Sequence, residues 1–458
     1  MSTQQHFDLV ILGGGPAGTR AAFDAAGAGM KTALVEPAFL GGACLNVGCI
    51  PTKYLLGASA AIPLLAVQRK YKVMSGGIHC DFAAAQSRKD RFIKGSRQSL
   101  EKKLLAAGIT LFRGRGGFSG PRRISVKGKD EAVLSFGDCI VATGSVPSSF
   151  PGLKPDGASV RSSAGILGLG AVPESLIIVG GGAIGLELGE LYHRLGCRIT
   201  LAEVMPRILP GEDEDVSEAV GAYCKKEGWT IHAGRRIASL STVDGQSLLR
   251  FEDGEEIRAE TSLLAIGRKA MTAPLAPGEA GLALSERGWL ATDEYLRCAE
   301  HVYAVGDVNG RTLLAHAADH QARHAVSLIS GATKGAYAPP AMPSCVYGTM
   351  EVMRVGPTVA ELRKNGAGKL SISRAPLAAN AIAQSYGHSQ GFARMVWEGD
   401  ALRGVCAVGH GVSHLVGAAS LLLALGVEKN IAPPVIFAHP TLDEVLESAM
   451  VATRESIQ

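Results

Sequence analysis

The sequence at residues 7–18 reads FDLVILGGGPAG, an apolar run that is broken by glycines and followed by small residues. Residues 7–12 predict a buried strand, and the small residues at 17–28 predict a helix. A second strand is expected at residues 32–35, directly before an acid, Glu36. Strand, glycine turn, helix and strand in this order predict the start of a βαβ unit.

The same design occurs a second time further along the chain. A strand is expected at residues 175–179, a helix at 186–195 and another strand at 199–202, directly before Glu203. In both copies the acid lies 23 residues after the first glycine, from Gly13 to Glu36 and from Gly180 to Glu203. One glycine motif would be weak evidence in a chain with 58 glycines, but two copies with matching flanks are strong evidence.

Each glycine of such a motif has its own role in holding a dinucleotide. The first makes a tight turn, the second lets the backbone approach a pyrophosphate, and the third packs the helix against the sheet. These glycines are, in order, Gly13, Gly15 and Gly18 in one copy and Gly180, Gly182 and Gly185 in the other. Glu36 and Glu203 would each hydrogen-bond a ribose. We favour this interpretation over two unrelated glycine turns, and two dinucleotide sites imply electron transfer between nucleotides.

Length and composition describe a globular protein with several domains. At 458 residues the chain exceeds the size at which one core stops growing, so we expect two to four domains. The net charge of +4 is small and is not gathered into basic tracts, which argues against a nucleic-acid partner. Residues 1–7 are polar and give no sign of a signal peptide, and the longest nearly apolar run, 415–427, is too short to span a bilayer. We expect a soluble, cytoplasmic protein.

Other segments suggest how the chain continues around these two units. Residues 82–107 predict a long charged helix, and 111–136 predict a small antiparallel sheet. After Pro339 the pattern changes to alternating strands at 352–355, 392–397 and 402–408, followed by an apolar helix at 415–425. Three prolines mark a domain boundary there, namely Pro339, Pro340 and Pro343.

A pair of cysteines follows directly after the first nucleotide motif. Residues 41–53 read GGACLNVGCIPTK and contain Cys44 and Cys49. In a regular helix these two residues would lie beyond the roughly 7 Å Cα limit for a disulfide, so the turn must distort if it is to bridge them. Gly48 and Pro51 make such a distortion plausible. No further ligand follows at metal-binding spacing, so we expect no metal, and a purely structural disulfide is disfavoured in a reducing compartment.

The remaining cysteines occur singly and are expected to be small buried hydrophobic residues. They are Cys80, Cys139, Cys197, Cys224, Cys298, Cys345 and Cys406.

The cysteine segment resembles the redox-disulfide signature of the pyridine nucleotide-disulfide oxidoreductases, a family that includes glutathione reductase, mercuric reductase and dihydrolipoyl dehydrogenase. The resemblance covers nearly the whole chain. It includes Ala142-Thr143-Gly144, which resembles the end of the first FAD portion, and the segment 303–307, which resembles the second FAD-contacting strand. It implies that Cys44 meets the substrate, that Cys49 contacts the flavin, and that Asp307 binds its ribityl-phosphate region. The proximity of Cys49 to a helix start and to Lys53 would favour its thiolate.

The resemblance also assigns roles to charged residues elsewhere. Lys53 resembles the family lysine that pairs with an acid of the second nucleotide helix, here Glu187, beside the flavin edge. Near the C-terminus, His439 and Glu444 stand at the position of a dyad in which the acid orients a proton-shuttling imidazole. Thr441 and Glu444 also have capping-box spacing, which offers a purely structural explanation. Gly267 is assigned to the NAD site.

Among family members, the sequence motifs are most like those of dihydrolipoyl dehydrogenase. The resemblance therefore implies oxidation of dihydrolipoyl groups, free or on a lipoyl domain, with FAD and NAD as cofactors. It also implies a 2-oxoacid dehydrogenase or glycine cleavage complex as the partner. Three departures bear on the substrate: Phe437 replaces a frequent histidine, His414 stands where an acid is common, and the segment 267–270 lacks a proline. A glutathione reductase-like enzyme and a non-catalytic flavoprotein subunit remain as alternatives.

The expected fold is α/β, with two Rossmann-like nucleotide-binding domains and a C-terminal α+β interface domain that forms a homodimer. The domains are expected at residues 1–146 (FAD, first part), 147–270 (NAD), 271–338 (FAD, second part) and 339–458 (interface).

Overall fold

The computed structural model describes residues 5–428 and 435–457. Parts of the predicted first and last domains, including the N-terminal residues Met1–Gln4, lie outside these ranges. The described chain divides into two compact units. Of the described residues, the first unit comprises 5–52, 87–148 and 267–339, and the second comprises 53–86, 149–266, 340–428 and 435–457.

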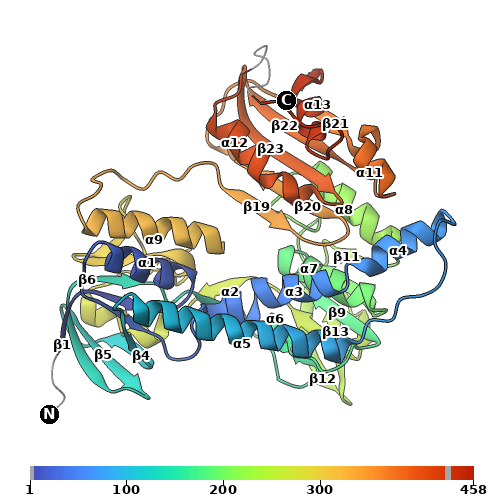
Figure 1. The fold of residues 1–458 in the computed structure, drawn as a ribbon. Helices are drawn as coiled ribbons and strands as arrows, with labels where there is room; N and C mark the ends of the chain where they lie inside the picture. Colours follow the sequence, from blue (N-terminus) through green and yellow to red (C-terminus); the bar gives the residue numbers. More distant parts are fainter. Residues whose placement is uncertain (1–4, 429–434, 458) are drawn as a thin grey trace. The chain divides into compact units, whose positions relative to one another are not determined.

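The first unit is built on a mainly parallel sheet with the strand order β17-β18-β6-β1-β2-β3. Its strands are β1 (Gln5–Leu12), β2 (Thr32–Val35), β3 (Thr110–Phe112), β6 (Ala132–Val141), β17 (Arg297–Ala299) and β18 (Val302–Ala304). Helices α1 (Pro16–Gly27) and α9 (Ala315–Ile329) lie side by side (Figure 1). Leu9 and Ile11 of β1 share a buried cluster with these two helices, which fixes the start of α1 at the carboxyl end of β1.

Shorter elements complete this unit. A hairpin of β4 (Gly114–Phe118) and β5 (Arg123–Gly128) extends antiparallel from β6. The remaining elements are α2 (Gly42–Val47), α3 (Cys49–Ala58), whose later residues belong to the second unit, α5 (Phe82–Ala106), β7 (Ser145–Pro147), β16 (Arg268–Ala270) and the 3-10 turns η1 (Ala273–Leu275), η2 (Pro277–Ala280) and η3 (Gly306–Asn309).

The second unit contains a parallel sheet with the order β11-β10-β9-β15-β8 and an antiparallel sheet with the order β12-β13-β14. The strands are β8 (Val160–Arg161), β9 (Ser175–Val179), β10 (Arg198–Glu203), β11 (Thr230–Ala233), β12 (Ile237–Val243), β13 (Gln246–Phe251), β14 (Glu256–Ala259) and β15 (Thr261–Leu264). The helices are α4 (Ala61–Lys70), α6 (Ser163–Leu167), α7 (Ala183–Arg194) and α8 (Glu214–Lys226).

The C-terminal part of the second unit is an antiparallel sheet with helices packed on it. Its strands, in the order in which they pair, are β19 (Pro343–Val346), β20 (Glu351–Val355), β23 (Ala401–Gly409), β22 (Gly391–Glu398), β21 (Leu370–Pro376) and β24 (Arg454–Ser456). The helical elements are α10 (Val359–Lys364), η4 (Leu377–Ala379), α11 (Ala381–Ser385), η5 (Val412–Leu415), α12 (Val416–Ala424) and α13 (Glu444–Val451).

The α/β architecture with two parallel nucleotide-binding-type sheets and a C-terminal α+β part agrees with the sequence prediction. The antiparallel sheet predicted at 111–136 is correct only in part. Strands β4 and β5 are antiparallel, but β3 pairs parallel with β2 and extends the main sheet. The reason is that α5 precedes β3 and acts as the crossover that a parallel strand requires.

One helical stretch of the described chain, Gly42–Lys70, is long and apolar enough to cross a membrane by length and composition alone. It exceeds the run at 415–427, so the sequence expectation of where the longest apolar segment lies was wrong. The stretch carries the two cysteines of the 41–53 segment. Within it α2 ends at Val47, and the backbone of the next residue, Gly48, leaves helical geometry (φ −140°, ψ −110°).

Candidate active site

The first glycine turn lies between β1 and α1. Gly13 has a φ of +106°, and a Cβ atom there would lie 2.3 Å from the carbonyl oxygen of Ala142. A Cβ atom at Gly18 would lie 1.8 Å from the carbonyl oxygen of Gly13. Only glycine therefore allows the chain to turn and α1 to approach β1 this closely. The backbone amides at the helix start are left to face an anion.

The carboxylate of Glu36 is held by backbone amides beside this turn. One oxygen, Oε2, accepts a hydrogen bond from the Gly14 amide at 2.7 Å, and Oε1 accepts one from the Ala38 amide at 2.8 Å. The side chain is thus fixed at the carboxyl end of β2, next to the start of α1, where a ribose hydroxyl pair of a dinucleotide would lie.

The second glycine turn repeats this construction between β9 and α7. Gly180 has a φ of +108°, and a Cβ atom at Gly185 would lie 2.1 Å from the Gly180 carbonyl oxygen. Glu203 is buried, and its carboxylate accepts hydrogen bonds from the Gly181 amide at 2.7 Å and the Met205 amide at 2.8 Å. The two copies therefore match in the turn, in the helix approach and in the hydrogen bonds that fix the acid.

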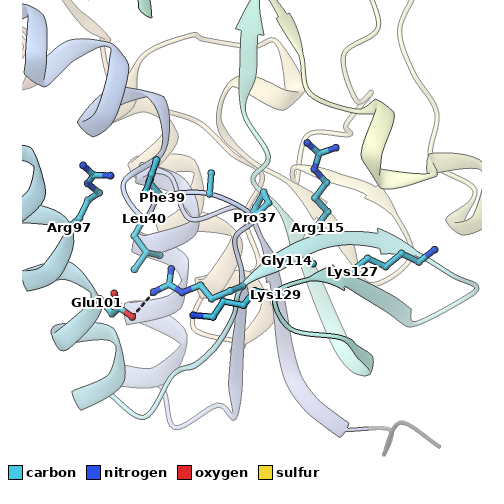
Figure 2. A pocket seen from close by; sticks show the side chains of 12 residues that line it. Pro37, Phe39, Leu40, Arg97, Glu101, Gly114, Arg115, Lys127 and Lys129 are labelled. Atoms are coloured by element: carbon cyan, nitrogen blue, oxygen red, sulfur yellow. Dashed lines mark ion pairs between the residues drawn. The ribbon is translucent and has the colours of Figure 1, made fainter. Parts of the chain in front are cut away.

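A pocket of about 440 Å³ begins at the residue after Glu36 (Figure 2). It is lined by Pro37, Ala38, Phe39, Leu40, Arg97, Glu101, Arg113, Gly114, Arg115, Lys127, Gly128 and Lys129. The adenosine end of a dinucleotide whose ribose is held by Glu36 would reach this pocket. Together with the glycine turn and the fixed carboxylate, it gives the first unit a donor and acceptor set that fits FAD.

Asp307 lies in η3 and takes part in a polar network with two residues of the first unit. Its Oδ2 accepts a hydrogen bond from the Ser145 hydroxyl at 2.5 Å, and Arg268 Nε lies 3.7 Å away. Arg268 Nε also donates to the Ser145 hydroxyl oxygen at 2.7 Å. The network holds the Asp307 carboxylate beside β7, and neither Ser145 nor Arg268 was singled out from the sequence.

Thr143, Gly144 and Gly267 form the backbone around that network. The Thr143 hydroxyl donates to the Met271 carbonyl oxygen at 2.8 Å, and Gly144 has a φ of +73°. Gly267 has a φ of +105°, and its carbonyl oxygen accepts from the Ser148 amide at 2.9 Å. Gly267 belongs to the first unit with Asp307, whereas Gly180, Gly182 and Gly185 belong to the second.

Cys44 and Cys49 lie on two consecutive helices rather than on one. Cys44 is in α2, which ends at Val47, and Cys49 is the first residue of α3. Cys44 is half-buried and Cys49 is exposed. The helix is therefore interrupted between the two sulfur-bearing residues, as their spacing requires.

Lys53 and Glu187 form an ion pair with 2.5 Å between Nζ and Oε2. The other Glu187 oxygen accepts a hydrogen bond from the Tyr347 amide at 3.2 Å, and Lys53 Nζ lies 4.6 Å from the centroid of the Tyr347 ring. Burial raises the pKa of Glu187, and the Lys53 charge opposes that rise. The pairing of Lys53 with Glu187 was expected from the sequence. The contacts of Tyr347 were not, because they depend on the connection between β19 and β20.

His439 and Glu444 are joined by a hydrogen bond of 2.8 Å between Nδ1 and Oε1. The His439 side chain is 78% exposed, and the hydrogen bond from His439 lowers the pKa of Glu444. The alternative capping box does not form. The Thr441 amide does donate to Glu444 Oε2 at 2.8 Å, but the Thr441 hydroxyl donates to the Ala438 carbonyl oxygen. Helix α13 begins at Glu444 itself, so Glu444 does not occupy the third helical position that a capping box needs.

Comparison with known proteins identifies the family. The model described as pyridine nucleotide-disulphide oxidoreductase matches residues 7–322, and the dimerisation domain of the same family matches residues 342–450. The chain belongs to the pyridine nucleotide-disulphide oxidoreductases. As a member of this family it is an FAD- and NAD-dependent flavoprotein oxidoreductase, and its C-terminal domain is the one through which two copies pair.

Full-length relatives support the same assignment. The chain is 36% identical over 464 residues to the dihydrolipoyl dehydrogenase of Chlorobaculum parvum, covering 99% of this chain and 98% of the relative. It is 34% identical over 470 residues to that of Bacillus subtilis, covering 98% and 99%.

Solved structures share the fold along nearly the whole chain. The HOCl-induced flavoprotein disulfide reductase RclA from Escherichia coli, solved as a Cu(II) complex, has a TM-score of 0.88 at 25% identity, covering 97% of this chain and 99% of that one. LpdA from Mycobacterium tuberculosis also has a TM-score of 0.88, at 24% identity and with coverages of 97% and 99%.

Among the residues that the structure describes, no group of three or more His, Cys, Asp and Glu side chains is arranged to hold a metal ion. Backbone amides bind Glu36 and Glu203, and Lys53 pairs with Glu187. The Ser145 hydroxyl donates to Asp307, and His439 and Glu444 bind one another.

Proposed function

We propose that this oxidoreductase oxidises dihydrolipoyl groups to the lipoyl disulfide with NAD⁺ as acceptor. The observation that carries the proposal is the His439–Glu444 hydrogen bond in a chain whose full-length relatives include several dihydrolipoyl dehydrogenases. With Glu444 accepting from Nδ1–H, His439 keeps its Nε2 lone pair for a proton from a substrate thiol.

In the proposed reaction His439 accepts the proton of one substrate thiol, and the thiolate attacks the sulfur of Cys44 in the Cys44–Cys49 disulfide. The second substrate thiolate then displaces Cys44, so that the lipoyl disulfide forms and both cysteines are reduced. Bound FAD supplies the two-electron chemistry that passes these electrons to NAD⁺. The balance is one dithiol and one NAD⁺ consumed, with one disulfide, one NADH and one proton released.

The remaining assignments belong to the same proposal. Gly13, Gly15, Gly18, Glu36, Lys53, Thr143, Gly144 and Asp307 would serve the FAD site, and Gly180, Gly182, Gly185, Glu187, Glu203 and Gly267 the NAD site. The domain boundaries at 146, 270 and 338 are proposed on the same grounds. We also propose a cytoplasmic location and service to a 2-oxoacid dehydrogenase or glycine cleavage complex.

A substrate panel with the purified protein tests the proposal. We expect turnover of dihydrolipoamide with NAD⁺, and much slower reduction of glutathione disulfide with NADPH. The reverse order of the two rates would favour a low-molecular-weight disulfide reductase, which the similarity to RclA and the Phe437 substitution support. A non-catalytic subunit would show neither turnover nor new titratable thiols after addition of NADH.

A further inference from the structure

The loop between Glu203 and α8, residues 204–213, packs against the second glycine turn. The Leu209 amide donates to the Gly181 carbonyl oxygen at 2.8 Å, and a Cβ atom at Gly181 would lie 3.0 Å from Ile208 Cγ2. The Gly181 amide in turn donates to the Glu203 carboxylate. The position of this loop is therefore coupled to the position of both the turn and the acid.

The loop has an unfavourable backbone conformation near its centre. Leu209 is buried and has a φ of +47°, in the left-handed region that residues with a Cβ atom rarely adopt. Its carbonyl oxygen accepts hydrogen bonds from the Glu212 amide at 2.9 Å and from the Ser217 hydroxyl at 3.2 Å. Such a conformation persists only where the surrounding structure holds it, so the end of the loop needs fixed contacts.

Arginines of the C-terminal sheet hold that end of the loop. Arg394 of β22 donates from Nη2 to Asp213 Oδ2 and from Nη1 to Asp215 Oδ1, each at 2.5 Å. Arg354 of β20 donates from Nε to Glu212 Oε2 at 2.8 Å. All of these residues belong to the second unit. The loop that begins at the nucleotide acid therefore ends on the dimerisation domain.

The contact between Arg394 and Asp213 is buried. Their side chains are 5% and 10% exposed, and the Asp213 carboxylate also accepts a hydrogen bond from the Val359 amide at 3.2 Å. Removing one partner of a buried ion pair leaves the other charge without compensation, whereas an exposed pair contributes little. Loss of Arg394 should therefore displace Asp213 and the loop that it ends.

We infer that Arg394 is a positioning residue for the NAD site, given the proposed assignment of the second glycine turn and Glu203 to NAD. It acts through Asp213 and the loop 204–213, which holds the turn. Nucleotide binding is thereby linked to the domain through which two copies pair.

Calorimetric titration of the FAD-loaded protein with ADP-ribose tests the inference. This compound has the adenosine, pyrophosphate and second ribose of NAD but no nicotinamide, so binding is measured without electron transfer. Arg394→Met should weaken ADP-ribose binding about tenfold. Arg394→Lys keeps a positive charge but has no planar fork to span two carboxylates, so it should weaken binding about threefold.

The matched control is Arg403→Met. Arg403 pairs with Glu398 at 2.5 Å within the same C-terminal sheet, and its side chain is 47% exposed. The variant removes an arginine and an ion pair of the same domain, so its ADP-ribose affinity should stay within about twofold of the wild type. FAD content, melting temperature and dimer mass show that each variant is folded.

A second measurement separates positioning of the NAD site from a general loss of structure. Flavin reduction by dihydrolipoamide without NAD⁺ should keep the wild-type rate in Arg394→Met, because the loop 204–213 serves the nucleotide only. The inference is overturned if folded Arg394→Met binds ADP-ribose as tightly as the wild type, or if Arg403→Met loses as much affinity. If Arg394→Met does not fold, wild-type affinity in Arg394→Lys overturns it.

The variant Glu203→Ser distinguishes failure of this inference from failure of the proposed NAD site. If Glu203→Ser weakens ADP-ribose binding and Arg394→Met does not, the second glycine turn holds the nucleotide and only the role of Arg394 is wrong. If neither variant weakens binding, the assignment of the second turn to NAD fails as well. Weaker binding in Arg394→Met supports its role whatever the result for Glu203→Ser.

Discussion

At the scale of single residues, Glu36 and Glu203 show how a short side chain is prepared for a ribose. Each carboxylate accepts hydrogen bonds from two backbone amides, and each lies at the carboxyl end of a parallel strand. Because the amides fix the position of the acid, no side-chain entropy has to be lost when a nucleotide binds. The fixed negative charge also opposes a 2′-phosphate.

The first prediction concerns nucleotide choice. The wild-type protein should prefer NAD(H) over NADP(H) by about 100-fold in kcat/KM, and Glu203→Ser should reduce that preference to about tenfold. Arg207 is a cation four residues after Glu203, but its Nη2 donates to the Glu212 carbonyl oxygen at 3.2 Å. Steady-state kinetics with both nucleotides provides the measurement, with the exposed Glu252→Ser as control. Equal kcat/KM values in the wild type would contradict the assignment.

At the scale of elements, the third glycine of the first motif decides how closely α1 approaches β1. Gly18→Ala would place a methyl group 1.8 Å from the Gly13 carbonyl oxygen, so α1 must shift away from the sheet. Gly27 ends the same helix, and a Cβ atom there meets nothing within 4 Å. We expect Gly18→Ala to lose FAD and about 2–4 kcal/mol of stability, whereas Gly27→Ala keeps FAD and gains about 0.5 kcal/mol.

FAD absorbance and thermal unfolding of the two alanine variants check this prediction. If both variants retain FAD equally, the close approach of α1 to β1 does not determine FAD binding.

Two histidines near the ends of α11 and β23 give the molecule a pH dependence. The rings of His388 and His410 are stacked with centroids 4.5 Å apart, and His388 Nε2 and His410 Nδ1 are buried without a hydrogen-bond partner among the described residues. Burial, then the neighbouring His410 and Arg194, lower the pKa of His388 to about 4. Burial also lowers the pKa of His410, opposed by Glu351 and reinforced by Arg194 and His414.

His388 and His410 bind a proton more readily in the unfolded chain than in the folded one. The folded state is therefore fully stable above pH 6.5 and loses free energy of unfolding as the pH falls from about 6.5 towards 4. Acidification from pH 7.5 to 5 should lower the free energy of unfolding by about 1 kcal/mol less in His388→Asn than in the wild type. This figure allows for the partial exposure of the ring. Melting curves across that range measure the effect, and the exposed His79→Asn serves as control. An unchanged pH slope in His388→Asn would exclude the histidine pair as its source.

The sequence predicted those elements whose signal is local. The strands and helices of both glycine motifs, the long helix α5 and the helix break at Gly48 follow from periodicity and from glycine positions. The parallel pairing of β3, the start of α13 at Glu444 and the Arg268–Ser145–Asp307 network depend on contacts between distant segments. The pocket that begins after Glu36 was not predicted for the same reason. Two of its lining residues, Arg97 and Arg115, come from separate elements and belong to no motif.

At the scale of the whole molecule, the exposed His439 lies in the domain through which two copies pair, whereas the cysteines lie in the other unit of the same chain. We expect His439 of one subunit to serve Cys44 of its partner.

Mixed dimers test this arrangement. A Cys44→Ser chain and a His439→Ala chain should each form nearly inactive homodimers, but every heterodimer should contain one intact site. Exchanged heterodimers should therefore recover about half the activity of a wild-type dimer. Separately tagged chains allow the heterodimers to be purified. Heterodimers without activity would place His439 and Cys44 of the same chain together.

The central claim is that substrate electrons enter through Cys44 and reach the flavin. Rapid anaerobic mixing of the FAD-loaded protein with dihydrolipoamide, without NAD⁺, measures this step directly through the flavin absorbance. We predict prompt two-electron reduction in the wild type and slower reduction by about 100-fold in His439→Ala. In Cys44→Ser we predict no reduction, with FAD retained and a long-wavelength band from the remaining Cys49 thiolate. Reduction of Cys44→Ser at the wild-type rate would contradict the account.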